Sequence, residues 1–119
     1  MSYQKFGNKQ TVVNGIKFSS RLESERYEQL LLLERAGEIS DLWLQVELQV
    51  NHGRIDPETG ERIRSTNYVA DFMYVDKAQH KIIIEDTKGM ETPEFRLKWN
   101  LAKSLYPEYE FRKVTREDV

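Results

Sequence analysis

The sequence predicts an α/β domain in which helices flank a mixed central sheet, in the order helix, strand, strand, strand, helix, strand. Apolar residues recur at helical spacing in two segments, each opened by a capping residue. In four further segments they alternate or run together as in strands. The length of 119 residues suits a single domain, 1–119, built around one sheet.

Residues 1–17 are polar and basic, and we expect them to form an N-terminal arm. Within the arm, Val12 to Lys17 contains the dipeptide Asn14-Gly15. Asn-Gly between short apolar stretches is typical of a tight hairpin turn. The arm is therefore predicted to carry a short strand or hairpin.

The first helix is predicted to begin after Ser20 and to end at Gly37. Ser20-x-x-Glu23 has the spacing of a capping box, and glycine is a common C-terminal stop. Glu23 has two interpretations. Its side chain either bonds back to the cap, or it points at the sheet, because it shares a helical stripe with Tyr27 and Leu30. A carboxylate that points inward needs a partner.

Residues 42–50 read as a half-buried strand, because Leu44, Val46 and Leu48 alternate with polar residues. The following segment, 51–65, is polar and contains the turn sequence Asp-Pro-Glu-Thr-Gly. We expect 51–65 to be the tip of a hairpin that projects from the body.

Residues 67–75 form the next predicted strand, apolar and aromatic apart from Asp71 at its centre. A lone aspartate in mid-strand is disfavoured by strand propensity and by burial. If 77–80 is a four-residue loop, Asp76 pairs with Lys81, and Asp71 then faces Asp86. Two facing carboxylates repel unless a cation lies between them or one is protonated.

The stretch from Lys81 to Gly89 is the centre of the chain's chemistry. Three consecutive isoleucines predict a buried strand that runs directly into Glu85, Asp86 and Lys88. At strand spacing Asp86 and Lys88 project to the same face. There a carboxylate can ligate a divalent metal, and a lysine can stabilise charge on a phosphate or orient the attacking water. The plainer interpretation is a solvated ion pair at a strand end.

The second helix is predicted to begin with Thr92 as its cap and Pro93 as its first residue, and to end at Pro107. We expect Leu97, Leu101 and Leu105 to form its core stripe. Residues 109–114 form the last predicted strand.

Composition excludes several classes of protein and site. No cysteine is present, so disulfides and thiolate zinc sites are excluded, which fits a cytoplasmic protein. The two histidines lie in predicted turns, and no glycine-rich phosphate loop supports a nucleotide cofactor. No apolar run approaches the ~20 residues of a membrane span. The net charge is −2, with basic segments at both ends of an acidic centre.

The chain resembles the PD-(D/E)XK nuclease superfamily, which has the restriction-endonuclease-like fold. The matching residues are Glu23 on the first helix, Asp71, and Asp86-Thr87-Lys88, and the resemblance covers about 18–114. More narrowly, FSSRLESERY, YVADF and EDTKG look like a family of small phage-encoded proteins related to Holliday junction resolvases.

Three features depart from the superfamily pattern. Ala70 precedes Asp71 where proline is usual, and Asp86 stands where glutamate is commoner. The adjacent Glu85 competes for the role of strand ligand, and Glu47 is a further acid that the pattern leaves open. We choose Asp86 because it shares a face with Lys88.

The resemblance implies hydrolysis of DNA phosphodiester bonds with Mg²⁺ or Mn²⁺. Glu23, Asp71 and Asp86 would be the metal ligands, with Lys88 as the fourth catalytic residue. Branched or Holliday junction DNA in recombination, repair or replication is the expected substrate. The alternative is a non-catalytic DNA-binding accessory protein of the same fold.

DNA and a second copy of the chain are the expected partners. A homodimer is expected because a domain this small does not easily span a four-way junction. Phosphate contacts are expected from the basic arm and the second helix. The residues are Lys5, Lys9, Lys17, Arg96, Lys98 and Lys103.

Overall fold

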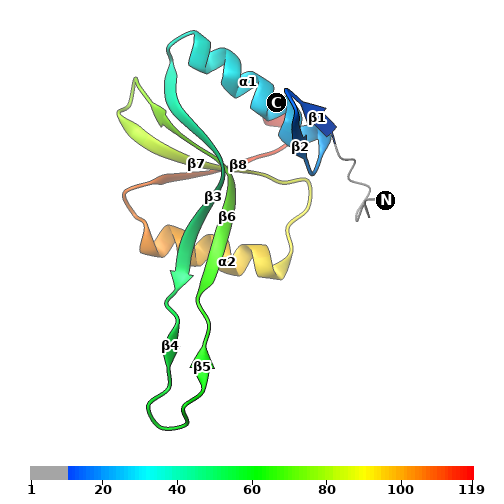
Figure 1. Cartoon of the computed structure of the whole chain (residues 1–119). Helices are drawn as coiled ribbons and strands as arrows, with labels where there is room; N and C mark the ends of the chain where they lie inside the picture. The colour runs from blue at the N-terminus through cyan, green and yellow to red at the C-terminus, as the bar shows by residue number, and fades with distance from the viewer. Residues whose placement is uncertain (1–10) are drawn as a thin grey trace.

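The computed structural model describes residues 11–119, so Lys5 and Lys9 of the predicted arm lie outside the described residues. The elements follow the predicted order (Figure 1). They are β1 Thr11–Val13, β2 Ile16–Phe18, α1 Arg21–Arg35, β3 Ile39–Asn51, β4 Arg54–Ile55, β5 Arg62–Ile63, β6 Thr66–Asp76, β7 Lys81–Thr87, α2 Pro93–Leu105 and β8 Glu110–Val114, with a 3₁₀ turn over Arg116–Asp118.

β1 and β2 form the hairpin predicted in the arm. Asn14 and Gly15 both have positive φ, 53° and 78°, as the tight turn between the two strands requires. Phe18 at the end of β2 is buried and its ring lies 5.0 Å from that of Tyr27. The β1–β2 hairpin is therefore packed against α1.

Both helices begin where the capping residues predict. Ser20 Oγ accepts a hydrogen bond from Glu23 N at 3.1 Å, and Thr92 Oγ1 accepts one from Phe95 N at 3.1 Å. These bonds satisfy backbone donors that have no partner inside the first turn. No helix in 11–119 is long and apolar enough to cross a membrane.

The central sheet has four strands in the order β3-β6-β7-β8. β3, β6 and β7 are antiparallel, and β8 returns parallel to β7 after the α2 crossover, so the sheet is mixed. Asp76 pairs with Lys81 and Phe72 with Glu85, which confirms the predicted register. The paired region ends one residue before Asp71 and Asp86, at the point where the candidate site begins.

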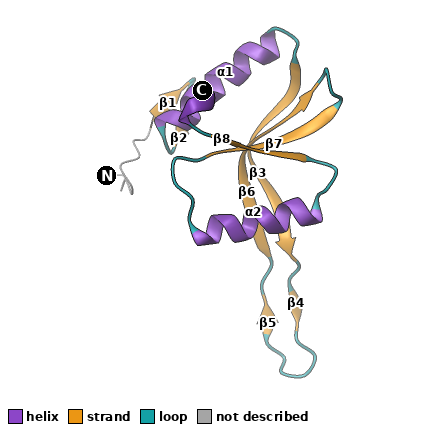
Figure 2. Cartoon of the chain, turned by 180° about the vertical axis from the view of Figure 1, so that it is seen from behind, coloured by secondary structure: helices purple, strands orange, loops and turns teal. Residues whose placement is uncertain are grey.

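The two helices cover opposite faces of the sheet (Figure 2). Against α1 the core contains Tyr27, Leu30 and Phe72. Against α2 it contains Phe95, Trp99, Ala102 and their partners on the strands. The sheet is thus buried between two layers, which accounts for the continuous apolar run of β7.

The prediction of which residues of α2 face the core is wrong. Leu97, Leu101 and Leu105 are 62%, 38% and 54% exposed. The helix instead buries Phe95 and Trp99, which lie on another face at the same four-residue spacing. The two aromatic side chains remove more apolar area from water than the leucines would, and Trp99 packs edge-on against Tyr68 and Phe111.

β3 changes face at Gln45, which has φ 52° and no partner in the register. Leu44 packs with the α1 layer and Val46 with the α2 layer, although residues two apart in a regular strand share a face. The change places the irregular point of β3 beside Asp71, the residue of β6 that falls between Ala70 and Phe72.

The predicted hairpin tip, 51–65, continues β3 and β6 beyond the sheet (Figure 1). From here on, this projecting hairpin, and not the N-terminal segment 1–17, is called the arm. It contains the short pair β4–β5 and a turn in which Asp56 Oδ1 accepts a hydrogen bond from Glu58 N at 2.9 Å. Arg54 and Ile55 are exposed, and the arm buries little apolar surface.

Candidate active site

Asp86 lies at the end of β7, on the face covered by α2, and only 2% of it is exposed. Its Oδ2 accepts a hydrogen bond of 2.5 Å from the hydroxyl of Tyr68 on β6. Its Oδ1 is buried and accepts no hydrogen bond from the described residues. The Lys88 ammonium 3.4 Å away offsets part of the cost of burying this oxygen, which still has room for a further ligand.

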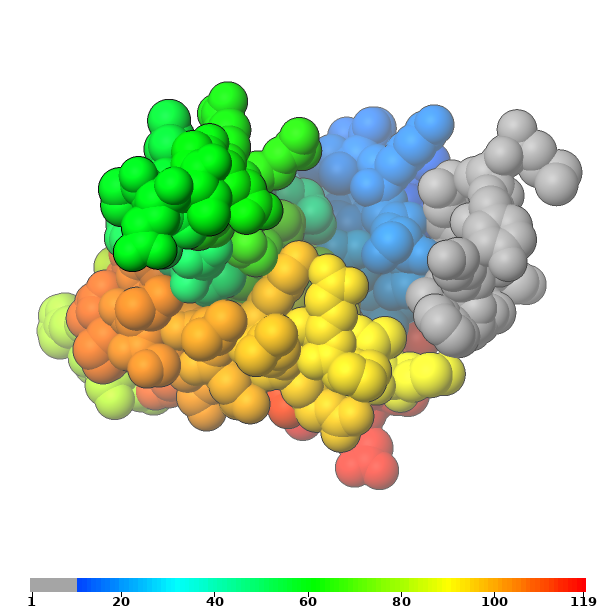
Figure 3. Space-filling model, turned by 90° about the horizontal axis from the view of Figure 1, so that it is seen from below, coloured from blue at the N-terminus to red at the C-terminus, as the bar shows by residue number. Residues whose placement is uncertain are grey.

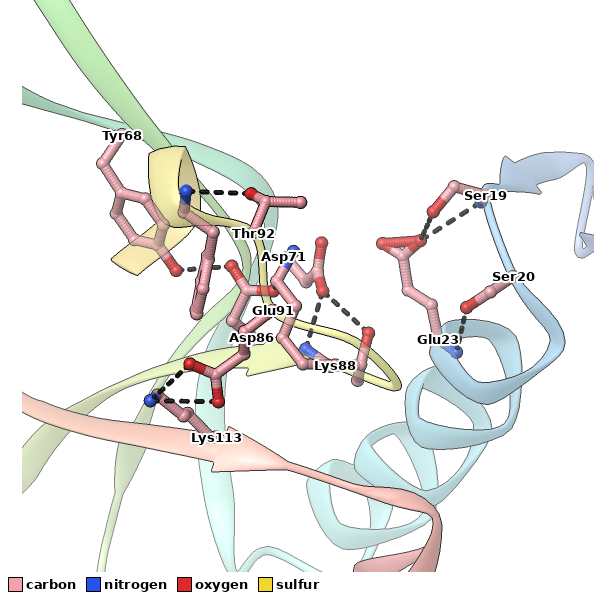
Figure 4. A network of polar contacts seen from close by, with 12 residues as sticks. Ser19, Ser20, Glu23, Tyr68, Asp71, Asp86, Lys88, Glu91, Thr92 and Lys113 are labelled. Atoms are coloured by element: carbon pink, nitrogen blue, oxygen red, sulfur yellow. Dashed lines mark hydrogen bonds and ion pairs between the residues drawn. The ribbon is translucent and has the colours of Figure 1, made fainter. Parts of the chain in front are cut away.

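Asp71 is fixed by the backbone and side chain of Thr87. Thr87 N and Thr87 Oγ1 each donate to Asp71 Oδ2 at 2.8 Å. The two bonds tie the middle of β6 to the end of β7 at the point where their ladder stops. Asp71 lies between Glu23 on one side and Asp86 on the other (Figure 4).

Of the two interpretations of Glu23, the structure agrees with an inward-pointing carboxylate and does not contain the side-chain bond back to Ser20. Its backbone N–H donates to the Ser20 cap, as in a capping box. Its carboxylate, however, points inward and accepts from Ser19 N and Ser19 Oγ through Oε1, and from Gln45 Nε2 through Oε2 at 3.1 Å. Only 2% of Glu23 is exposed, so it is part of the site and not only a cap.

Lys88 comes directly after β7, and its side chain lies beside Asp86, as expected for two residues that project to the same face of a strand. Its Nζ lies 3.4 Å from Asp86 Oδ1, an ion pair without a well-formed hydrogen bond. The ammonium also lies 4.4 Å from the centre of the Phe95 ring. This cation–π contact holds the side chain beside the carboxylate while it remains partly exposed.

Burial and mutual repulsion disfavour the charged forms of these carboxyls. Burial and then the Asp71 carboxylate raise the pKa of Glu23 to about 7. The same two causes raise the pKa of Asp86 to about 7, although Tyr68 and Lys88 act in the opposite direction. The site therefore gains from any cation that lets all its carboxyls ionise together.

Two surface hollows open beside these residues. One, of about 320 Å³, is lined by Ser19, Asp71 and Lys88 among others. The second, of about 250 Å³, is lined by Asp86, Lys88, Phe95 and Lys98 among others. Lys88 borders both hollows.

Asp71 and Asp86 are the side chains best suited to a divalent metal. As they stand, no three acidic or histidine side chains in 11–119 surround one point closely enough to enclose an ion. Mg²⁺ commonly uses one or two carboxylates and completes its shell with water and substrate phosphate oxygens. Asp86 Oδ1, which accepts no hydrogen bond of good geometry from the described residues, and the neighbouring Asp71 fit such an open site.

Glu85 and Glu47, the two competing acids, point elsewhere. Glu85 lies on the α1 face, fully buried, and accepts from Arg26 through both oxygens at 2.8 and 2.6 Å. Tyr74 donates a third hydrogen bond to it. Glu47 is exposed and lies near Asn67 Nδ2. Of the two neighbouring acids, Asp86 lies beside Lys88 and Glu85 beside Arg26.

The predicted DNA-binding cations are only partly gathered at the site. Lys98 lines the hollow beside Asp86 and forms an ion pair of 2.9 Å with Glu94. Lys17, Arg96 and Lys103 are exposed and line neither hollow.

Sequence reasoning missed three residues that fix the carboxylates, because each acts through a contact between distant segments. They are Tyr68, Thr87 and Gln45.

The comparisons with curated proteins and with solved structures give no match. A family model matches residues 3–118, nearly the whole chain, and is described as "Protein of unknown function (DUF1064)". The site residues Glu23, Asp71, Asp86 and Lys88 all lie inside the matched region. The chain therefore belongs to the DUF1064 family.

Proposed function

We propose that this protein is a metal-dependent endodeoxyribonuclease that hydrolyses phosphodiester bonds in branched DNA, such as Holliday junctions, during recombination, repair or replication in a bacterial cytoplasm. The observation that carries the proposal is a buried Asp86 that pairs with Lys88 through Oδ1 and is repelled by the neighbouring Asp71 carboxylate. Buried, mutually repelling carboxyls beside a lysine are typical of functional sites and costly elsewhere.

Asp71 and Asp86 would hold the metal, and Glu23 would complete the ring of negative charge around it. Bound Mg²⁺ or Mn²⁺ supplies Lewis acidity toward the phosphate and a water of lowered pKa. Tyr68 and Thr87 hold the two aspartates in place through their hydrogen bonds. Lys88 offsets the negative charge that develops on the reacting phosphate, because its ammonium borders both hollows.

The topology supports a restriction-endonuclease-like core as part of the proposal. One helix, three antiparallel strands, a crossover helix and a strand parallel to the third follow each other along the chain. Acids on the first helix, in the second strand and at the end of the third then meet at one edge. This is the arrangement that the sequence resemblance implies.

The proposed partners are DNA and a second copy of the chain. Lys98 lies closest to the reacting groups and would contact a phosphate next to the cleaved bond. Lys17, Arg96 and Lys103 would contact phosphates further away. The homodimer is proposed because a domain this small does not easily span a four-way junction. Two sites are also needed to cut two strands of a junction.

A nuclease assay tests the proposal. The wild-type chain is incubated with Mg²⁺ or Mn²⁺ and a panel of junction, flap and linear DNA, beside Asp71→Asn and a matched control, Asp41→Asn. Asp41 is exposed and lies on β3 away from the site. We expect cleavage by the wild type and the control, and none by Asp71→Asn.

The non-catalytic alternative gives a different result in the same assay. A DNA-binding accessory protein would bind junction DNA without cutting any substrate in the panel with either metal. Cleavage by Asp71→Asn at the wild-type rate would contradict the assignment of the site, since that variant lacks a carboxylate charge.

A further inference from the structure

The arm, residues 51–65, carries three arginines that lie outside the candidate active site. Arg54, Arg62 and Arg64 all line one hollow of about 940 Å³ along the arm. All three are exposed, and none forms an ion pair in the part of the chain that the structure describes. Exposed arginines along one short stretch of the arm make it a candidate surface for an anion.

The acids of the arm do not neutralise these arginines. Asp56, Glu58 and Glu61 lie in and beside the turn, and Asp56 uses its carboxylate to accept from Glu58 N. The arginines lie on the stem, where Ile55 pairs with Arg62 and Arg54 with Ile63. The stem is thus cationic while the turn is acidic.

Gly53 lets the two strands of the hairpin stem approach each other where the hollow begins. A Cβ atom at this position would lie 3.1 Å from Ser65 N and 3.2 Å from Ile63 O. Both neighbours are backbone atoms, which cannot move without opening the stem. The close approach is therefore built into the chain, and it fixes how the arginines are presented.

The arm projects from the body, next to α2 (Figure 1). Seen from below, the side chains of the arm (green) lie next to those of α2 (orange and yellow) (Figure 3). Ile55, in β4 of the arm, is 68% exposed. An exposed apolar side chain flanked by guanidinium groups on a two-stranded ribbon suits a groove of duplex DNA, which admits such a ribbon between phosphates.

We infer that the arm is a second DNA-binding element, in which Arg54, Arg62 and Arg64 bind backbone phosphates of a duplex while Ile55 enters its groove. The identity of the ligand as DNA rests on the proposed function. The arm would hold the duplex while the carboxylates act on the phosphodiester bond. Arginine suits this role because its planar donors bind phosphate in pairs.

DNA binding in EDTA tests the arm without cleavage. Affinity for a labelled duplex is measured against salt for the wild type, for Arg54→Gln/Arg62→Gln and for a control, Arg35→Gln/Lys77→Gln. The control removes the same charge from exposed positions on the body. Each phosphate contact contributes about 0.9 to the salt slope, so the arm variant should lose up to ~1.8 while the control keeps the slope.

Ile55→Ser gives an independent readout. It should weaken binding without a change in the salt slope, because it removes an apolar contact and no ion pair. Equal slopes and affinities for the wild type and both arm variants would overturn the inference. Loss of binding in the arm variants together with no cleavage by the wild type would uphold the arm and overturn the proposed nuclease.

Discussion

The hydroxyl of Tyr68 donates a hydrogen bond of 2.5 Å to Asp86 Oδ2, and both residues are 2% exposed. Burial and the neighbouring Asp86 charge raise the pKa of Tyr68, so the hydroxyl keeps its proton at any working pH. The bond favours the charged form of Asp86 and leaves Oδ1 turned toward Lys88. Tyr68 is thus a positioning residue for the candidate site.

Tyr68→Phe should lower DNA cleavage at pH 7 by about 10–100-fold, since a hydrogen bond to a charged group contributes about 1.5–3 kcal/mol. The ring still packs against Phe95 and Trp99, so folding should be preserved. Without the donor, the pKa of Asp86 rises further. The pH–rate profile should therefore move to higher pH, and activity should partly return there. An unmoved profile would assign Tyr68 a packing role only.

Asp86→Asn should stabilise the metal-free protein, and more at pH 8 than at pH 5. The pKa of Asp86 is raised to about 7, so the folded state binds more protons than the unfolded state between about pH 4 and 7. The wild type therefore loses stability as pH rises through this range. At ~1.4 kcal/mol per pKa unit, the gain at pH 8 is at most about 4 kcal/mol.

Urea unfolding in EDTA at both pH values measures this difference. Glu23 titrates in the same range in both proteins, so the comparison of wild type with variant isolates Asp86. A pH-independent difference between the two would contradict the raised pKa.

Lys88→Ala should reduce turnover far more than metal affinity, because the ammonium acts on the phosphate and is not a ligand. Metal affinity is measured by calorimetry with Mn²⁺, and turnover at saturating Mn²⁺. Lys77→Ala, an exposed lysine in the turn before β7, is the control and should change neither value. A variant that loses metal affinity but keeps turnover would reverse the assignment.

Glu23→Gln separates the capping role from the role in the site. The backbone bond to Ser20 does not depend on the side chain, so the N-terminal cap of α1 should be preserved in Glu23→Gln. Cleavage should fall by orders of magnitude, and higher Mn²⁺ should restore part of it. Wild-type activity in a folded Glu23→Gln protein would restrict the site to Asp71, Asp86 and Lys88.

Glu85→Gln is the matched control for that substitution. Glu85 is equally buried, but it is paired with Arg26 and lies on the face of β7 opposite to Asp86. Removing its charge leaves a poorly compensated guanidinium inside the protein, which should cost about 3–5 kcal/mol of stability. Turnover per folded molecule should be unchanged, the reverse of the result expected for Glu23→Gln.

Much of the architecture could be predicted from local sequence signals. The caps Ser20 and Thr92 mark helix starts, and the short turn after Asp76 sets its pairing with Lys81. That register is enough to bring Asp71 toward Asp86. Such signals depend on residues close in sequence, whose geometry is fixed by the period of the strand or helix.

Two features could not be predicted in this way. They are the face of α2 that packs against the sheet and the residues that hold the site carboxylates by hydrogen bonds. Two stripes with the same spacing, one of leucines and one led by Phe95 and Trp99, run along α2, and periodicity alone does not decide between them. The bonds from Tyr68 and Thr87 to the aspartates join different strands. They depend on tertiary packing, which leaves no mark in the local pattern.

The change of face at Gln45 has a consequence for local unfolding. The two hydrophobic layers lie on opposite sides of the sheet, and β3 passes from one to the other at this residue. Opening of either layer therefore releases the backbone there. In hydrogen exchange, amides flanking Gln45 and Asp71 should report the free energy of the weaker layer, while those of Ile83 and Ile84 report global unfolding.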